Sequence, residues 1–180
     1  MTQELYQKAM KFAGEKHYTQ KVPGTNANYL LHISNVAMEV IYAYAHNKSF
    51  DIDFAVQVAI LHDTIEDTNT DFEEIKAEFN EQIAHAVQAL TKDDNLETKK
   101  KKMLDSLQRI NKLQKEVGLV KIADRITNLQ TPPSHWSKEK VLNYCEEAKL
   151  IFKHLNDKND FLHERLNKKI EEYELNISKL

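Results

Sequence analysis

Hydrophobic residues recur three and four positions apart over most of this chain, which is the period of an amphipathic α-helix. No segment shows the strict alternation of apolar and polar residues that is typical of a half-buried strand. The pattern therefore predicts an all-α protein. The expected helices cover residues 2–18, 29–47, 52–66, 71–79, 81–91, 97–107, 109–130, 138–155 and 160–178.

Polar or proline-containing segments separate these helices. Pro23-Gly24-Thr25-Asn26 is a turn cluster, and Pro132-Pro133 ends the helix before it. Asp51 and Asp71 are candidate N-terminal caps, because their side chains can accept hydrogen bonds from the free amides of a first helical turn. Gly118 lies inside a helical pattern and marks a place where that helix could kink or break.

The composition is that of one soluble domain, with 180 residues of which 41% are hydrophobic and 29% are charged. We expect a single helical domain over residues 1–180. The formal net charge of -3 gives no general attraction to nucleic acid, so a small phosphorylated ligand is expected rather than a nucleic-acid duplex. No apolar run approaches about 18 residues, which predicts no membrane span and no secretory signal. The single cysteine, Cys145, cannot form an internal disulfide, as expected for the reducing cytoplasm.

The segment Leu61-His62-Asp63-Thr64-Ile65-Glu66-Asp67-Thr68 carries candidate chemistry. Residues three and four positions apart share a face of a helix, so His62 and Asp63 could bind one ion while Glu66 and Asp67 lie beside it. A divalent ion lowers the pKa of bound water from about 15.7 toward about 7, and a neighbouring carboxylate can orient that water or take its proton. Taken alone, these residues are equally typical of a solvated helix end.

Two distant residues favour a metal site. His32 begins an apolar-periodic stretch, and Asp124 lies inside another, where an unpaired carboxylate is costly to bury. Each has another interpretation by itself: His32 as a core histidine, and Asp124 in an ion pair with Arg125 or Lys121. Together with His62 and Asp63, they give nitrogen and oxygen ligands that suit Mn²⁺ or a similar octahedral ion. That ligand set is His32, His62, Asp63 and Asp124.

The order of these residues resembles the HD metal phosphohydrolases, and Glu66-Asp67-Thr68 is similar to the hydrolase domain of the RelA/SpoT enzymes, which remove the 3′-pyrophosphate of the alarmone ppGpp. Further motifs follow in the family's order through nearly the whole chain. They are Phe12-Ala13 with His17 and Gln20, Tyr29-Leu30-Leu31-His32, Ala89-Leu90-Thr91-Lys92, Lys102-Met103-Leu104, and Lys121-Ile122-Ala123-Asp124-Arg125 with Asn128-Leu129. Residues 131–137 with Val141, Tyr144 and Ala148 look like the stand-alone small alarmone hydrolases, a group that includes the metazoan SpoT homologue.

This resemblance implies a single HD-domain helical bundle that hydrolyses (p)ppGpp with manganese. It assigns Mn²⁺ to the four ligands above, and it assigns the attacking water to Glu66 and Asp67. It also places a group of residues near the nucleotide substrate. They are Lys21, Lys102, Asn128, Lys140 and Tyr144. The run from Lys99 to Lys102 also fits a charged, solvated helix face.

Two departures from the family concern the base of the nucleotide. Lys21-Val22-Pro23-Gly24 stands where the family often has Arg-Lys-x-Gly, and Ile33 rather than proline follows His32. A guanidinium that would stack flat on a base is therefore absent from this stretch, and lysine does not replace planar stacking. The preference for guanine or adenine is left open.

Two other functions are left open by the sequence. A different HD phosphohydrolase, acting on ppApp, NADPH or a nucleoside monophosphate, would use the same metal ligands. A non-catalytic module that binds alarmone is disfavoured, because Glu66 and Asp67 are retained and a sensor has little need of a water-activating pair. The amphipathic stretch after Asp160 packs either on the body of the protein or on a second subunit, so a homo-oligomer is one of two expectations.

Overall fold

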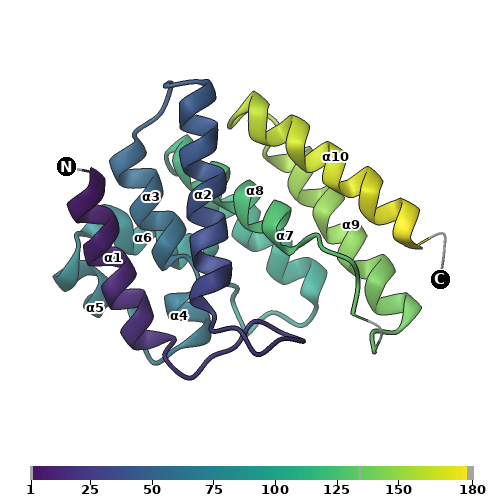
Figure 1. The fold of residues 1–180 in the computed structure, drawn as a ribbon, viewed down its shortest axis with the longest axis horizontal. Coiled ribbons are helices and arrows are strands. Elements are labelled where there is room, and N and C mark those ends of the chain that lie inside the picture. Colours follow the sequence, from purple (N-terminus) through teal and green to yellow (C-terminus); the bar gives the residue numbers. More distant parts are fainter. Residues whose placement is uncertain (1, 134, 178–180) are drawn as a thin grey trace.

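The computed structural model describes residues 2–133 and 135–177, which form ten helices (Figure 1). The predicted all-α fold is confirmed, and the described residues contain no strand, only an isolated bridge between Lys21 and Asn28. The helices are α1 Thr2–Lys16, α2 Leu30–His46, α3 Ile52–Leu61, α4 Thr64–Asp67, α5 Phe72–Glu78, α6 Glu81–Leu90, α7 Lys99–Ile110, α8 Lys115–Asn128, α9 Lys138–His154 and α10 Asp160–Ile177.

The prediction of one helix over residues 52–66 is wrong, because α3 ends at Leu61 and the short α4 begins at Thr64. The Thr64 hydroxyl donates a hydrogen bond of 2.7 Å to the Leu61 carbonyl. That bond occupies a carbonyl of the last turn of α3, and a local side-chain bond of this kind competes with continuation of the helix. His62 and Asp63 therefore lie in a break between two helices.

The prediction of a helix over residues 109–130 is also wrong at its start. The chain leaves α7 after Ile110 and enters α8 at Lys115, with Gln114 in an extended conformation at ψ 148°. The pattern placed the boundary between these two helices at residue 108, but the chain stays helical to Ile110 and turns at residues 111–114. Gly118 causes no break, because it lies inside α8 and makes room for the Lys158 side chain, whose Cγ would be 2.8 Å from an added Cβ.

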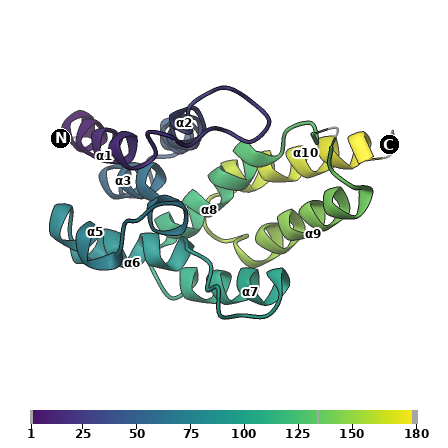
Figure 2. The same cartoon turned by 90° about the horizontal axis from the view of Figure 1, so that it is seen from below.

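Helix α8 is the centre of the molecule, and every residue from 116 to 126 in it is buried. Figure 2 shows it between the helices of the N-terminal half and the pair α9 and α10. It packs against α2, α3, α6, α7, α9 and α10, while α2 and α3 also pack against each other. The elements that carry His32, His62 and Asp124 are therefore in mutual contact.

The C-terminal helix α10 packs on the body of the protein, against α2, α8 and α9. It buries Leu162, Leu166, Ile170 and Tyr173 in these contacts. Packing on the body of the protein is therefore observed, and the expectation of a homo-oligomer stays a prediction. None of the described helices has the length and apolarity that are needed to cross a bilayer.

Both predicted caps are confirmed, and the cap of α3 gives a stability prediction. Asp51 Oδ1 accepts hydrogen bonds from the amides of Asp53 and Phe54 at 3.0 and 3.1 Å. We expect Asp51→Ala to lower the free energy of unfolding by about 1 kcal/mol, because those two amides lose their acceptor. Urea denaturation measures the change. Asp51→Asn keeps an acceptor and should lose clearly less, so equal losses in both variants would contradict the capping role.

Candidate active site

Three candidate ligand atoms meet inside the bundle. His32 lies on α2, His62 directly follows α3, and Asp124 lies on α8; all three are buried. The Nε2 atoms of the two histidines are 3.3 Å apart, and Asp124 Oδ1 is 3.5 Å from His32 Nε2 and 3.8 Å from His62 Nε2. All three ligand atoms lie within 4.8 Å of one another, so they can share one metal ion at ordinary bond lengths.

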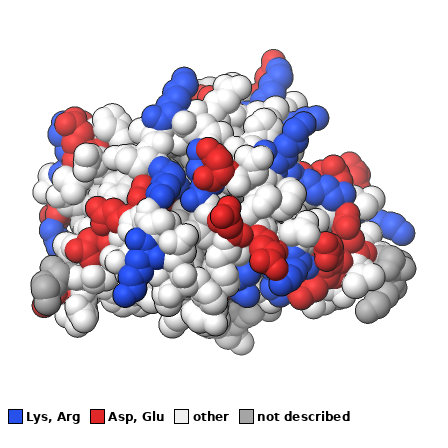
Figure 3. Space-filling view, turned by 90° about the horizontal axis from the view of Figure 1, so that it is seen from above, with Lys and Arg blue, Asp and Glu red and all other residues white. Residues whose placement is uncertain are grey.

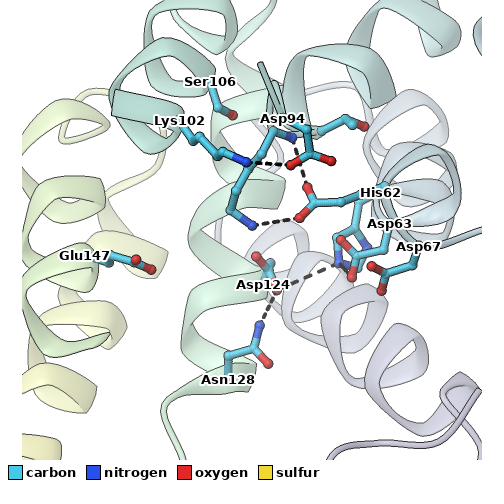
Figure 4. Close-up of polar contacts among 12 residues, drawn as sticks. His62, Asp63, Asp67, Asp94, Lys102, Ser106, Asp124, Asn128 and Glu147 are labelled. Carbon is cyan, nitrogen blue, oxygen red and sulfur yellow. Dashed lines mark hydrogen bonds and ion pairs between the residues drawn. The ribbon is translucent and has the colours of Figure 1, made fainter. Parts of the chain in front are cut away.

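Asp63, the predicted fourth ligand, lies at the edge of this group. Its Oδ2 is 2.9 Å from His62 Nε2 and 3.7 Å from His32 Nε2, and it accepts a hydrogen bond of 2.6 Å from the Tyr29 hydroxyl. Adjacent residues of a regular helix point about 100° apart. The break between α3 and α4, where Asp63 has φ -103° and ψ 0°, allows His62 and Asp63 to approach the same point (Figure 4).

Buried polar partners orient these side chains. His62 Nδ1 donates a hydrogen bond of 2.8 Å to the Ala59 carbonyl, so its Nε2 is the nitrogen that faces the group. Asp124 Oδ2 pairs with Lys121 at 3.0 Å, and its Oδ1 accepts a hydrogen bond of 2.5 Å from Asn128. The ion pair with Lys121 that the sequence offered as an alternative is therefore present. It is compatible with a metal site, because Oδ1 still faces the histidines.

Ionised carboxylates and cationic side chains are paired closely in the site. Burial opposes a charge on His62, but the neighbouring Asp63 outweighs it and raises the pKa of His62 to about 10. Burial also opposes ionisation of Asp124, but Lys121 and the two histidines hold the pKa of that carboxyl well below its usual range. A metal ligand must be without its proton, so a cation bound at these carboxylates would replace the proton on His62 Nε2.

The two carboxylates predicted to act on water lie beside the ligand group and have different partners. Glu66 accepts hydrogen bonds from the backbone N–H and from Nζ of Lys92, at 3.0 and 2.8 Å. Asp67 Oδ2 accepts a hydrogen bond of 2.8 Å from Gln20 Nε2. Burial raises the pKa of Asp67. Figure 4 shows Asp63 and Asp67 next to His62, with Asp124 facing them from α8.

Two cavities flank the aromatic residues Trp136 and Tyr144. The first has a volume of about 580 Å³ and is called the lysine cavity here, because Lys92, Lys99, Lys102 and Lys140 line it together with Glu66. The second has a volume of about 560 Å³ and is called the His32 cavity; Asn128 and residues 22–25 also line it. Clefts of this size accommodate small organic ligands.

Four of the five residues predicted to bind the nucleotide line these cavities. Tyr144 lines both, Asn128 lines the His32 cavity, and Lys102 and Lys140 line the lysine cavity. Lys21 is exposed, and it is absent from the described residues that line the His32 cavity, although residues 22–25 are present. The role of Lys21 stays a prediction.

Several residues at the site received no role from the sequence, among them Tyr29, Lys92 and Trp136. Tyr29 contacts Asp63, and its place three residues before His32 was a signal that the two share a helix face. Lys92 contacts Glu66 from 26 residues away, and the sequence holds no signal for that pairing. Trp136 lies between the cavities, where Lys140 Nζ is 4.1 Å from the centre of its ring. The contact of Lys92 with Glu66 depends on tertiary structure alone, whereas Trp136 and Lys140 are only four residues apart in the sequence.

The all-α bundle and its buried histidines and aspartate define the class of protein. A family model described as "HD domain" matches residues 9–161, and the chain belongs to this family. The segment His62-Asp63 supplies the adjacent His and Asp of the site.

Relatives are known in animals and bacteria. The chain is 32% identical over 168 residues to the guanosine-3′,5′-bis(diphosphate) 3′-pyrophosphohydrolase MESH1 of Xenopus tropicalis, covering 91% of each chain. It is 31% identical to the MESH1 of Homo sapiens, covering 88% of each chain. It is 34% identical over 130 residues to a guanosine-3′,5′-bis(diphosphate) 3′-pyrophosphohydrolase of Aquifex aeolicus, covering 71% of this chain and 18% of that protein.

A solved structure shares the fold. It is that of a metazoan ortholog of SpoT that hydrolyzes ppGpp, and it matches with a TM-score of 0.79. The match covers 93% of this chain and 94% of the other, at 24% sequence identity. The arrangement of helices is thus that of a known HD-domain protein.

Proposed function

We propose that this protein is a manganese-dependent (p)ppGpp 3′-pyrophosphohydrolase of the small stand-alone type, which releases pyrophosphate by the attack of water. The observation that carries the proposal is the buried group of His32, His62 and Asp124 beside the carboxylates of Glu66 and Asp67. The choice of substrate is supported by the MESH1 relatives, which are named for this reaction and match over most of their length.

The donor atoms fit a divalent cation such as Mn²⁺. The group combines two imidazole nitrogens with carboxylate oxygens and contains no thiolate, which favours an octahedral ion over structural zinc. We assign His32, His62, Asp63 and Asp124 as its ligands. A bound Mn²⁺ ion lowers the pKa of water and polarises a phosphoryl oxygen.

The other side chains of the site have separate tasks in this proposal. Glu66 and Asp67 orient the attacking water or take its proton. The lysines of the lysine cavity neutralise charge on the substrate phosphates, and Asn128 and Tyr144 contact the nucleoside.

Acidic and basic side chains are interspersed on the face shown in Figure 3, without a continuous basic field that a nucleic-acid duplex would need.

The proposal extends to the setting of the enzyme. We propose that residues 1–180 form one HD hydrolase domain and that the protein acts in the cytoplasm on alarmone made in the stringent response.

Product analysis of the purified protein tests the proposed reaction. The protein is incubated with ppGpp, ppApp, NADPH or a nucleoside monophosphate, in the presence of Mn²⁺ or of a chelator. We expect release of pyrophosphate from ppGpp with Mn²⁺ and none with chelator, because a bound Mn²⁺ ion would lower the pKa of the attacking water. Relative rates on ppGpp and ppApp then measure the base preference.

The other outcomes would identify the alternatives. Turnover of NADPH or a nucleoside monophosphate alone would overturn the proposed substrate and favour another HD phosphohydrolase. Tight binding of ppGpp without any turnover would favour a regulatory module that senses alarmone. Equal rates with Mn²⁺ and with chelator would contradict the metal mechanism.

A further inference from the structure

A short hydrogen-bonded chain joins the loop after α1 to Asp67. His17 directly follows α1 and is 1% exposed, and its Nδ1 lies 2.5 Å from Gln20 Oε1. Gln20 Nε2 in turn donates to Asp67 Oδ2 at 2.8 Å. The Gln20 amide therefore connects a buried histidine to a carboxylate of the active site that is 47 residues away in the chain.

The chemistry of these groups fixes the direction of every hydrogen bond in the chain. An ionised carboxylate only accepts, so the amide nitrogen of Gln20 must face Asp67 and its oxygen must face His17. That oxygen only accepts, so the proton of His17 must be on Nδ1. Burial lowers the pKa of His17, which favours the neutral ring. The remaining nitrogen, Nε2, has no hydrogen-bond partner among the described residues.

Glu66 and Asp67, the two carboxylates proposed to act on water, have different hydrogen-bond partners. Both oxygens of Glu66 accept hydrogen bonds from Lys92. In the part of the chain that the structure describes, the Asp67 side chain has one hydrogen-bond donor, Gln20, which contacts Oδ2. Asp67 Oδ1 is therefore the carboxylate oxygen of the pair that retains its full capacity to accept a hydrogen bond from water.

The loop between α1 and α2, which carries Gln20, is hydrogen-bonded to the metal site as well. The Gln20 carbonyl accepts a hydrogen bond of 2.9 Å from the Tyr29 amide, and the Tyr29 hydroxyl donates to Asp63 at 2.6 Å. The Tyr29 ring packs against the rings of His17 and His32, at centroid distances of 5.1 and 5.0 Å. One structural unit therefore orients both Asp63 and Asp67.

We propose that Gln20, held by His17, is a positioning residue that fixes the Asp67 carboxylate for its work on the attacking water. By binding Oδ2, the Gln20 amide stops the rotation of the carboxylate and leaves Oδ1 for the water. This inference rests on the function proposed above for Asp67. It adds that the loop between α1 and α2 sets the orientation of the Asp67 carboxylate. Glu66 and the four proposed metal ligands all lie outside this loop.

A double-mutant cycle on the manganese-loaded protein tests this role. Gln20→Met removes the amide without adding charge, and Asp67→Asn removes the carboxylate. We expect Gln20→Met to lower kcat by about 10- to 100-fold, as replacement of an outer-shell partner typically does, while KM and manganese content are unchanged. In the Asp67→Asn background the same change should cost almost nothing, because Gln20 acts through Asp67.

Matched variants separate the positioning role from a structural one. Gln20→Glu keeps an acceptor for His17 Nδ1–H but lacks the donor to Asp67, so it should lose kcat as well. Gln7→Met makes the same substitution at an exposed position of α1 and should leave kcat unchanged. Multiplicative losses in the double mutant, or a loss of manganese that parallels the loss of kcat, would overturn the proposal.

A measurement without substrate keeps this inference separate from the proposed function. Nitrogen-15 NMR of the imidazole rings is expected to show the His17 proton on Nδ1 in the wild-type protein and a changed His17 signal in Gln20→Met. A proton on Nε2 would overturn the hydrogen-bonded chain even in an active enzyme. If ppGpp is not hydrolysed, the proposed function fails, and the cycle is measured with the nucleotide that the protein does hydrolyse.

Discussion

Asp63→Ala is expected to abolish metal binding and turnover together. Asp63 Oδ2 lies 2.9 Å from His62 Nε2 and 3.7 Å from His32 Nε2, at the edge of the ligand group that opens toward Asp67. Its loss removes one of the ligands and part of the negative charge that attracts the ion. Elemental analysis after equilibrium dialysis should find no manganese in the variant under conditions that load the wild-type protein. Its turnover should equal that of the wild-type protein with chelator.

The control for this variant is Asp157→Ala. Asp157 lies in the turn between α9 and α10, with a side chain that is 69% exposed, so the substitution removes a carboxylate of no use to the site. Manganese content and turnover should be unchanged there. If Asp63→Ala retained its manganese, Asp63 would not be a ligand, and the group of His32, His62 and Asp124 would hold the ion without it.

Glu66→Gln is expected to separate metal binding from turnover, because the variant should keep the metal and lose turnover. Glutamine has the size of glutamate, and its carbonyl can still accept a hydrogen bond from Lys92, so the local structure should persist. It lacks the charge that orients a water molecule or takes its proton. Loss of a general acid-base group typically lowers kcat by about 10²- to 10⁴-fold. Parallel measurement of kcat and manganese content distinguishes this result from that for Asp63→Ala.

Glu73→Gln on α5 provides the matched control, because Glu73 is exposed on the surface. It should have wild-type kcat. Near-normal turnover in Glu66→Gln would show that the role of Glu66 in water activation is wrong. A loss of manganese in that variant would instead place Glu66 among the residues that hold the ion.

Local sequence features predicted most helices and two of their N-terminal caps. Asp51 and Asp71 act as caps because a cap depends on amides two and three residues away. The break at His62 and Asp63 escaped the prediction, since apolar residues stay in helical register through it and the Thr64 hydroxyl ends the helix. The turn between α7 and α8 was predicted at residue 108 and lies at residues 111–114, because periodicity does not report where a helix stops.

In the candidate site, too, local sequence features predicted some residues, and contacts that depend on tertiary structure were missed. The structure brings His32, His62 and Asp124 together as predicted, and places Asp63 beside them, because residue types and family-like motifs identify candidate ligands in the sequence. The hydrogen bonds that orient the carboxylates were not predicted. Gln20 is 47 residues from Asp67 and Lys92 is 26 residues from Glu66, and neither pair shares a helix. Such contacts depend on how α4 packs against α6 and against the loop that follows α1.

The proposed ligands lie on three separate elements, namely α2, the break after α3, and the central helix α8. An ion held by them is a cross-link through the middle of the bundle, present in the native state and absent from the unfolded chain. Thermodynamic linkage then adds about 2.7 kcal/mol of stability when the free ion is at 100 times its dissociation constant. The supply of the metal would therefore control the resistance of this protein to unfolding and to proteolysis, as well as the rate of its reaction.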